Sequence, residues 1–219
     1  PPHIQYPKGL NTNEISVLHK DSKGNIWMGT WGAGVNVYDP KTRTFRYFTY
    51  SLSDSTTLSA NFITDIFETA EGEIWVGTIL GVSILYSQDD IEKGRFQRLK
   101  PPAANPFSQI DIPSLGDPFD RVDVECIYQD KAGQIWLGTS KGLYRFDRVG
   151  RRFIPVDLYS HDVGSTGHVT VYDISEDEAG YLWLGTTQGL SRFDPRSNSF
   201  LHYTEKDGLP DGIVVGIET

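Results

Sequence analysis

The sequence lacks the features that mark several large classes of protein. Cys126 is the only cysteine in 219 residues, which excludes a disulfide within the chain and a cysteine-rich zinc site. No apolar run approaches the ~18 residues of a membrane-spanning helix, and no stretch shows a helical period of apolar residues. The 20 Lys and Arg are outnumbered by 29 Asp and Glu. Phosphate binding needs clustered positive charge, so we expect neither nucleic acid as a partner nor contact of this segment with a membrane. The nearest approach to such a cluster, RVGRR at 148–152, is interpreted as a solvated hairpin tip.

Groupings that carry out catalysis or hold metal ions are also missing. No two of the five histidines have the i, i+4 spacing of a helical zinc site, and neither a Gly-x-Ser-x-Gly nor a phosphate loop occurs. The acidic groups at 89–90 and 176–178 offer too few alternating oxygen ligands for a calcium loop. Cys126 falls in a predicted strand, where a small buried side chain is expected. We therefore expect no cofactor, no metal ion and no catalytic residue in this segment.

One short phrase, however, occurs four times. GNIWMGT at 24–30 returns as GEIWVGT at 72–78, GQIWLGT at 133–139 and GYLWLGT at 180–186. A period of 40 to 50 residues is typical of propellers and arrays. The longest interval contains a Pro-rich insertion at 101–119, interpreted as a loop between units. The sequence therefore predicts one all-β region over 1–219, a β-propeller with about four visible repeats.

Each repeat has the pattern of a four-stranded antiparallel blade. The expected blades cover 13–50, 61–100, 122–158 and 169–204, with partial strands at both ends of the chain. A tight turn with Asp first and Gly fourth precedes the phrase in three repeats, whereas the second repeat has Thr69 at the first position. The Gly-Thr at its end is expected to let the chain turn closely. Four tryptophans are predicted to fill the gaps between neighbouring blades: Trp27, Trp75, Trp136 and Trp183.

These residues carry a resemblance to a known family. The recurring acidic turn, I-W-x-G-T, G-L/V and Y/F-D-P, together with DGLP at 207–210, resemble two-component regulator propeller repeats. The resemblance covers nearly the whole chain outside 101–119. It implies the periplasmic sensor region of a bacterial hybrid sensor histidine kinase, and many such kinases respond to breakdown products of complex carbohydrates. By this resemblance the chain is a fragment of a larger propeller, unless its end strands pair to close a smaller ring.

Candidate ligand residues lie where the copies of the repeat differ. Trp31 follows the first phrase, flanked by Gly32 and Gly34, where the other copies have Ile79, Ser140 or Thr187. An aromatic plane with polar neighbours is typical of sugar binding, which combines stacking and hydrogen bonds. Trp31 could equally cover the end of the ring or meet a partner domain. The other candidates lead into first strands or lie between second and third strands: Asn13, Asn61, Asp123, His168, Lys141 and Gln188.

Three functions remain open at this stage. The first is a module that senses a small molecule or oligosaccharide. The second is a scaffold for protein contacts or for a homodimer of the full ectodomain, without a small ligand. The third is an enzyme similar to propeller lyases, which needs a paired His and acidic residue that the sequence does not display. Asp65 and Asp173 occupy the same point of their first strands, where they either line a channel or bond the backbone.

Overall fold

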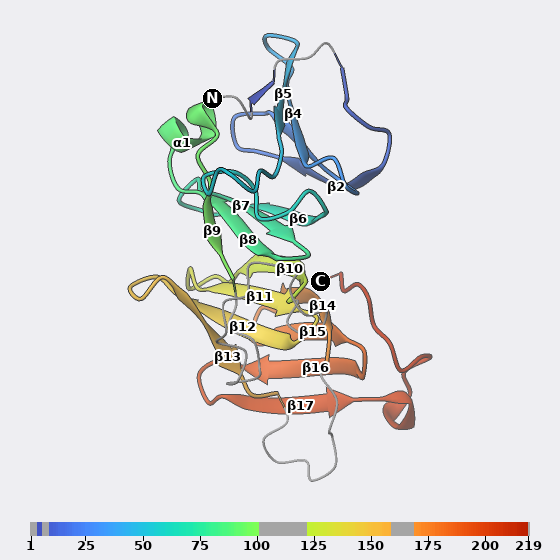
Figure 1. The fold of residues 1–219 in the computed structure, drawn as a ribbon. Coiled ribbons are helices and arrows are strands. Elements are labelled where there is room, and N and C mark those ends of the chain that lie inside the picture. Colours follow the sequence, from blue (N-terminus) through green and yellow to red (C-terminus); the bar gives the residue numbers. More distant parts are fainter. Residues whose placement is uncertain (1–3, 6–8, 101–121, 159–168, 219) are drawn as a thin grey trace. The chain divides into compact units, whose positions relative to one another are not determined.

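The computed structural model describes residues 4–5, 9–100, 122–158 and 169–218 (Figure 1). The chain divides into two compact units, Pro1–Lys100 and Pro101–Thr219. The predicted insertion at 101–119 lies outside the described residues.

The first unit contains two antiparallel sheets with the strand orders β1-β5-β4-β3-β2 and β6-β7-β8-β9. Blade one is the sheet of β2–β5, and blade two is the sheet of β6–β9. Their elements are β1 (Ile4–Gln5), β2 (Ile15–Lys20), β3 (Ile26–Thr30), β4 (Val35–Asp39), β5 (Thr44–Phe48), β6 (Ile63–Glu68), β7 (Ile74–Thr78), β8 (Gly81–Leu85), α1 (Gln88–Lys93) and β9 (Gln97–Leu99).

The second unit repeats this arrangement. Blade three has the order β10-β11-β12-β13, and blade four has β14-β15-β16-β17. Their elements are β10 (Val124–Gln129), β11 (Ile135–Thr139), β12 (Gly142–Asp147), β13 (Arg152–Val156), β14 (Val171–Glu176), β15 (Leu182–Thr186), β16 (Gly189–Asp194), β17 (Ser199–Tyr203) and the 3-10 turn η2 (Glu205–Asp207).

The prediction of an all-β fold made of four-stranded antiparallel blades is confirmed. The partial strand at the start of the chain is β1, in which Ile4 and Gln5 pair with Phe48 and Tyr47 on the open edge of blade one. An edge strand presents unpaired backbone groups, and β1 supplies partners for some of them.

The first strand of every blade contains a bulge. The register shifts between Ile63 and Asp65 in blade two, and at the equivalent point in each of the other blades. A bulge breaks strict alternation, because two residues of one strand then face one residue of its partner. This irregularity explains why the first strands lack the clean alternating pattern of the others.

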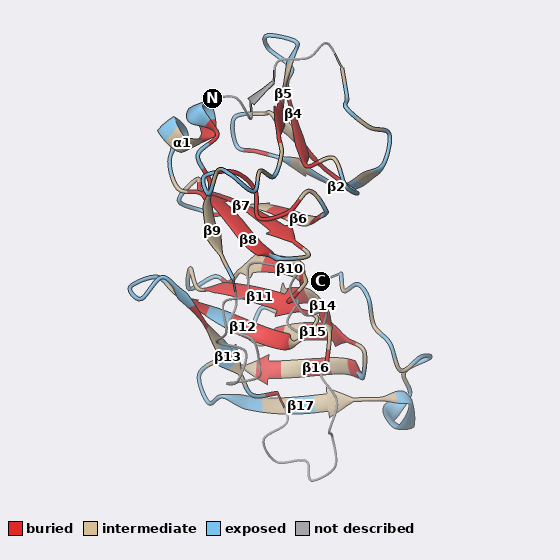
Figure 2. Ribbon diagram, viewed as in Figure 1, coloured by how far each residue is buried: buried red, intermediate tan, exposed pale blue. Residues whose placement is uncertain are grey.

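The hydrophobic core of each unit lies between its two sheets. In the first unit, Trp27 and Phe48 of blade one form one buried cluster with Ile63 and Ile66 of blade two. In the second unit, Trp136 of blade three packs with Phe193 of blade four, with ring centroids 5.6 Å apart. Figure 2 shows buried residues along β4, β8 and β11, and exposed residues at hairpin tips. Burying the inner face of each sheet is the main stabilising contribution to such a fold.

The Gly of the Gly-Thr pair has a role that we did not expect. A Cβ built on Gly138 would lie 2.6 Å from the carbonyl oxygen of Val171, the first residue of β14 in the next blade. On Gly29 it would lie 2.6 Å from the Cγ2 atom of Ile63, and on Gly185 2.7 Å from the carbonyl oxygen of Val214. Each glycine therefore lets the leading residue of a following segment pack directly on the second strand. The Gly-Thr pair thus adds this packing role of the glycine to the close turn expected after the phrase, where Thr30 bonds Gly34 O.

The acidic turn before each phrase is tied to the tryptophan within it. Asp21 accepts hydrogen bonds from the backbone N–H groups of Lys23 and Asn25, and from the indole Nε1 of Trp27 at 2.9 Å. Burial raises the pKa of Asp21, but the bonds from Trp27, Asn25 and the backbone outweigh burial, so its pKa lies below the usual value. Asp130 and Asp177 bond Trp136 and Trp183 in the same way. One carboxylate thus fixes both the turn and the indole.

Blade two lacks this Asp and achieves the same result with a different pair. The Thr69 hydroxyl accepts from the backbone N–H of Glu73, and Glu73 Oε2 accepts from Trp75 Nε1 at 3.0 Å. Thr69 and Glu73 are both buried. The carboxylate has moved four residues along the chain, but the buried indole N–H keeps a charged acceptor.

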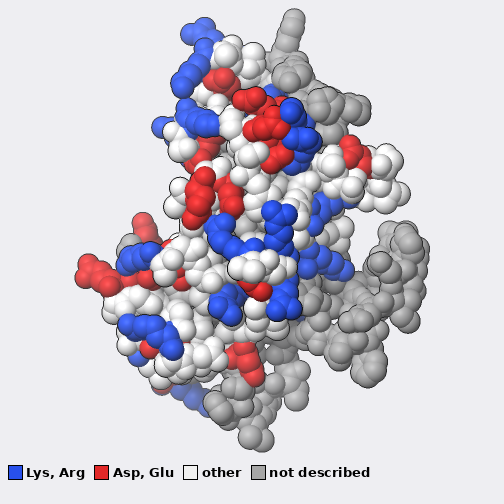
Figure 3. All heavy atoms as spheres, turned by 90° about the vertical axis from the view of Figure 1, so that its left-hand side faces the viewer, with Lys and Arg blue, Asp and Glu red and all other residues white. Residues whose placement is uncertain are grey.

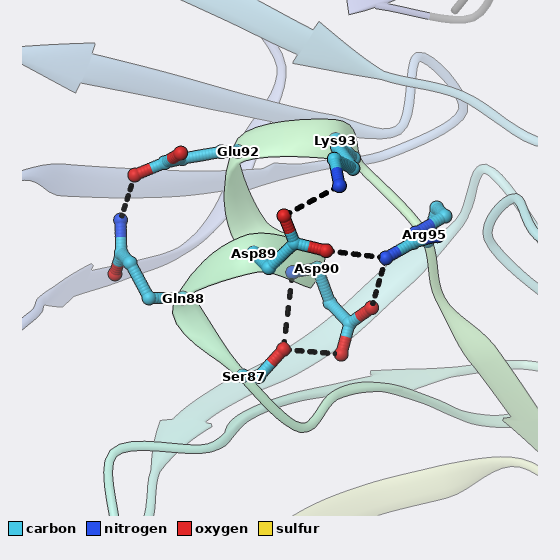
Figure 4. A network of polar contacts seen from close by, with 7 residues as sticks. All are labelled: Ser87, Gln88, Asp89, Asp90, Glu92, Lys93 and Arg95. Carbon is cyan, nitrogen blue, oxygen red and sulfur yellow. Dashed lines mark hydrogen bonds and ion pairs between the residues drawn. The ribbon is translucent and has the colours of Figure 1, made fainter.

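Blade two also contains a short helix, contrary to the expectation of a chain without helices. α1 replaces the hairpin between the third and fourth strands (Figure 4). Its N-cap is Ser87, whose hydroxyl accepts from the N–H of Asp90, and its C-cap is Gly94 with a left-handed φ of 62°. Asp89 pairs with Lys93 and Arg95 at 2.6 and 2.5 Å. Six residues with one buried apolar side chain, Ile91, are too few to show a helical period.

Candidate functional site

Each blade has two different ends. At the Asp end lie the turns that follow Asp21, Thr69, Asp130 and Asp177. At the Thr–Gly end lie the loops that follow Thr30, Thr78, Thr139 and Thr186. In all four blades this fully buried threonine donates to the carbonyl oxygen of the loop's last glycine and accepts from a loop N–H. The same two bonds close all four loops.

The loop of blade one has one residue more than the others. Thr78 pairs with Gly81 across a two-residue loop, as do the equivalent residues of blades three and four. In blade one, three residues separate Thr30 from Gly34, and the first of them is Trp31. Trp31 thus begins a loop that is one residue longer than the loops that begin with Ile79, Ser140 and Thr187.

The backbone of this loop is held by hydrogen bonds from several directions. Trp31 N donates to Glu14 O, and the N–H groups of Gly32 and Gly34 both donate to Asn61 O, at 3.2 and 3.0 Å. The Asn11 side chain donates to Ala33 O at 2.9 Å. A loop fixed in this way presents its side chain without a large loss of conformational entropy on binding.

The indole of Trp31 projects from this fixed loop. Trp31 is 55% exposed, and its ring meets the edge of Phe62 at a centroid distance of 5.8 Å and an interplanar angle of 89°. Trp31 and Phe62 also form an isolated antiparallel bridge between the two blades of the first unit. The two rings form an exposed aromatic platform, defined by Trp31 and Phe62. The carbonyl oxygen of Asn61 holds the loop beneath it.

Within the first unit, two further candidates, Asn61 and Asn13, are connected with the Trp31 loop. Asn61 bonds the Trp31 loop through its carbonyl oxygen, while its Oδ1 accepts from Tyr50 N at 2.6 Å. Asn13 is exposed and directly precedes Glu14, whose carbonyl oxygen bonds Trp31. These three residues belong to the Thr–Gly end of the first unit.

The remaining candidates belong to the second unit. Asp123 N donates to Ser140 Oγ and Asp123 O accepts from Ser140 N, whereas Lys141 and Gln188 lie in the loops after Thr139 and Thr186. Burial raises the pKa of Glu125, and the negative charge of Asp123 raises it further. No described contact joins Asp123, Lys141 and Gln188 into one cluster, and His168 lies outside the described residues.

The residues that lead into the first strands are not at equivalent positions. The loop residue after each threonine donates to a carbonyl oxygen of the strand entrance, and these acceptors are Glu14, Phe62, Asp123 and Thr170. Asp123 therefore corresponds to Phe62 rather than to Asn61, whose equivalents are the buried Val122 and Val169. Asn13 and Asn61 lie two residues before β2 and β6, whereas Asp123 lies one residue before β10, so the prediction compared positions that are not equivalent.

The four phrase tryptophans differ in their surroundings. Trp27 and Trp136 lie within the cores between paired sheets, and Trp75 is fully buried. Trp183 is half-buried and stacks on Tyr203 at a centroid distance of 5.8 Å, with the Arg192 guanidinium 6.0 Å from its ring.

Asp65 and Asp173 bond the backbone. Oδ1 of each accepts from the N–H of the next residue, Ile66 or Ile174, at 2.8 and 2.9 Å. Oδ2 of Asp173 also accepts from Ile217 N at 2.7 Å. Of the two interpretations left open by the sequence, backbone bonding is the one that these contacts match.

Phe62 is the site residue that the sequence analysis missed. Phe62 was not among the candidates, yet it is 40% exposed and contacts Trp31. The available signal was its place in the repeat, where the other copies have the polar residues Glu14, Asp123 and Thr170.

The described part of the chain shows no cluster of three or more His, Cys, Asp or Glu arranged to hold a metal ion. Among the same residues, no helix is both long and apolar enough to cross a membrane.

Comparison with known proteins gives the repeats an identity. The model of the two component regulator propeller family matches the chain four times, at residues 9–32, 57–79, 118–141 and 165–188. A search of curated proteins finds no match.

Solved structures share the propeller fold at low sequence identity. The extracellular domain of BT4673 from B. thetaiotaomicron, described as a one component and as a hybrid two component system, is 17% identical with a TM-score of 0.72. The alignment covers 95% of this chain and 25% of that chain. PorZ, a bacterial surface component of the type-IX secretion system of Porphyromonas gingivalis, is 18% identical, with a TM-score of 0.61 over 95% of this chain and 30% of its own. An ancestral GH74 enzyme is 14% identical, with a TM-score of 0.56 over 82% and 22%.

These likenesses show the fold alone. The three proteins are an extracellular domain of a one or two component system, a secretion-system surface component and an enzyme. The present chain spans about a quarter of the length of the BT4673 chain that it matches. Function must therefore be argued from the residues of this chain.

Proposed function

Because this chain is built of two component regulator propeller repeats, we propose that it is a ligand-sensing module in the extracytoplasmic part of a bacterial two-component sensor. The proposed ligand is derived from a carbohydrate and binds on the aromatic platform of Trp31 and Phe62. Signalling would then reside in other parts of the parent protein, with this segment acting as a non-catalytic, periplasmic binding element.

The observation that carries this proposal is an exposed tryptophan on a loop whose backbone N–H groups at 31–34 are all hydrogen-bonded. Trp31 leaves more than half of its surface in water although Phe62 already contacts it. An aromatic face of this kind stacks on the C–H face of a sugar ring, and polar neighbours bond the hydroxyl groups. Asn13, which is exposed beside the platform, supplies a side-chain amide for that purpose.

Titration calorimetry against a panel of oligosaccharides tests the proposal. For a glycan that binds, Trp31→Ala should weaken the affinity by about 30-fold, the ~2 kcal/mol of a buried aromatic anchor. Asn13→Ala should weaken it by about fivefold, the loss of one hydrogen bond. Leu18→Ala is the matched control, because Leu18 is 66% exposed in the middle of β2, away from the loop. Equal affinities of wild type and Trp31→Ala would refute the site.

A second function, protein docking or dimerisation, is favoured by one further observation. Leu80 is 41% exposed in the loop of blade two, and its neighbour Ile79 bonds Phe62 O. Trp31, Phe62 and Leu80 together offer an apolar surface that could meet another protein. Sedimentation of wild type and Trp31→Ala distinguishes the two functions: a loss of self-association without any change in glycan binding would favour docking.

A further inference from the structure

The hairpin between β12 and β13 concentrates positive charge on an acidic chain. Residues 145–152 contain four arginines and one aspartate, a balance of +3, whereas the whole chain carries −9. All four arginines are exposed, and none of the basic residues in this stretch is a lysine. The hairpin projects from its sheet in Figure 1, and Figure 3 shows Lys and Arg side chains gathered on that side of the molecule.

The equivalent hairpins of blades one and four show what this turn requires. Asp39, Asp147 and Asp194 each accept, through Oδ1, the N–H of the residue two positions on, at 2.8, 3.1 and 3.0 Å. The residue four positions after each of these aspartates has a left-handed φ of 48° to 56°. The three turns therefore share one backbone geometry. This geometry does not require the side chains by which the three turns differ.

Blade three departs from the other two at nearly every solvent-facing position. Arg148 replaces a proline, which normally favours such a turn by fixing φ. Arg152 replaces a hydroxyl residue that bonds its neighbour at 2.7 to 2.8 Å in the other hairpins. The turn sequences are PKTRT at 40–44, RVGRR at 148–152 and PRSNS at 195–199. Blade three thus lacks the proline and the hydroxyl pair of the other two turns. Arg152 instead contacts Asp147 Oδ2 at 3.3 Å, and the turn has three exposed arginines.

The tip of this hairpin is apolar. Val149 is 98% exposed, where the other two hairpins have Lys41 and Arg196. An aliphatic residue between arginines suits an interface that is anionic at its surface and apolar just below it. A soluble polyanion has no apolar layer, so it would not bury Val149.

We propose that the β12–β13 hairpin is a docking surface for an anionic lipid membrane, with the arginines on lipid phosphates and Val149 at the boundary of the acyl chains. Arginine suits phosphate because its planar fork donates two parallel hydrogen bonds. The expectation of no membrane contact rested partly on the missing spanning segment, and a hairpin that lies on a surface needs none.

The position of the hairpin fits this role within the second unit. It lies at the Asp end of β12, whereas the loop that contains Lys141 lies at the opposite, Thr–Gly end of the same strand. A membrane docked at the hairpin would leave the Thr–Gly end of blade three open to ligand.

Co-sedimentation of the 219-residue chain with vesicles tests the proposal. We expect binding to vesicles of equal parts phosphatidylcholine and phosphatidylglycerol, and little binding to pure phosphatidylcholine. Replacing 148–152 with the PRSNS turn of blade four keeps the turn geometry and removes a net two positive charges. Binding should then fall about 125-fold: about fivefold for each of the two charges, and about fivefold again because the swap also removes Val149. Lys41→Gln/Arg43→Asn removes the same charge from blade one and should leave binding nearly unchanged.

Val149→Ser separates a membrane from a soluble polyanion. It should weaken vesicle binding about fivefold, because burial of the valine side chain is lost, and should not alter binding to dextran sulfate. Equal binding of the PRSNS variant and wild type, or equal binding to both kinds of vesicle, would overturn the proposal. Vesicle binding that is insensitive to Val149 and is displaced by dextran sulfate would also overturn it and assign the hairpin to a soluble polyanion.

Discussion

Blade one binds its indole N–H with Asp21, whereas blade two uses Thr69 and Glu73. This difference predicts that a second substitution in blade one can restore the stability lost when Asp21 is replaced. Asp21→Thr should remove the acceptor of the Trp27 indole, which is fully buried. A buried donor left without a partner costs about 1–3 kcal/mol, and the lost charge-assisted bonds to backbone N–H groups add to this. The introduced threonine keeps one bond to residue 25, as Thr69 does to Glu73. The expected loss in the free energy of unfolding is about 3 kcal/mol.

Adding Asn25→Glu should restore most of this loss. The new carboxylate occupies the position of Glu73, two residues before the tryptophan, and can accept from Trp27 Nε1. We expect the double variant to recover about 2 kcal/mol. Asn25→Glu alone should destabilise the chain, because its carboxylate would face Asp21 in place of an amide that now donates to it at 2.7 Å. The coupling energy in this double-mutant cycle should therefore be large and favourable.

Urea unfolding followed by far-UV circular dichroism measures the four proteins of the cycle. The slope of free energy against urea should stay constant if the variants change stability and not the extent of the fold. A loss below 1 kcal/mol for Asp21→Thr would refute the role given to the carboxylate. A double variant no more stable than Asp21→Thr would show that the blade-two solution depends on other residues of that blade.

Three further predictions concern other contacts. Gly138→Ala should lower the free energy of unfolding by about 1–3 kcal/mol, because the new methyl group meets Cys126 Sγ and the backbone of the next blade. Gly133→Ala, where only Gln129 Nε2 comes within 4 Å, should cost about 1 kcal/mol for its left-handed φ. The pKa of Asp21 is lower in the folded chain than in the unfolded chain, so its contribution to the free energy of unfolding is complete above about pH 4 and is lost as the pH falls through the folded pKa. Between about pH 5 and pH 2, the free energy of unfolding should therefore decrease less with falling pH in Asp21→Thr than in the wild type. Arg98→Met should speed hydrogen exchange in 51–57, since its guanidinium bonds three backbone carbonyl oxygens there; unchanged exchange would contradict this.

The strands and the acidic turns could be predicted because their signals are local. Trp27 and Asp21 lie six residues apart, and the pattern that contains them is repeated, so the sequence itself marks them as structural. The role of Gly138 could not be predicted from such a signal, because the atom that excludes a side chain there belongs to Val171. Local patterns identify elements but not what packs against them.

The candidate site could be predicted only in part for the same reason. Trp31 stood out because it breaks the repeat, and it is exposed as a binding residue should be. Phe62 became part of the platform only through its contact across blades. The short helix α1 was missed although Ser87 and Gly94 mark its two ends, because six residues are too few for a period.

The glycine contacts have a consequence for how such chains change length in evolution. Gly29, Gly138 and Gly185 each receive the leading aliphatic residue of the segment that follows, Ile63, Val171 or Val214. Recombination that duplicates or deletes one full period would join the same kinds of residue again and would create no new junction chemistry. A gene of this type can therefore gain or lose whole blades by unequal crossing-over, while the side chains that distinguish one blade from another diverge independently.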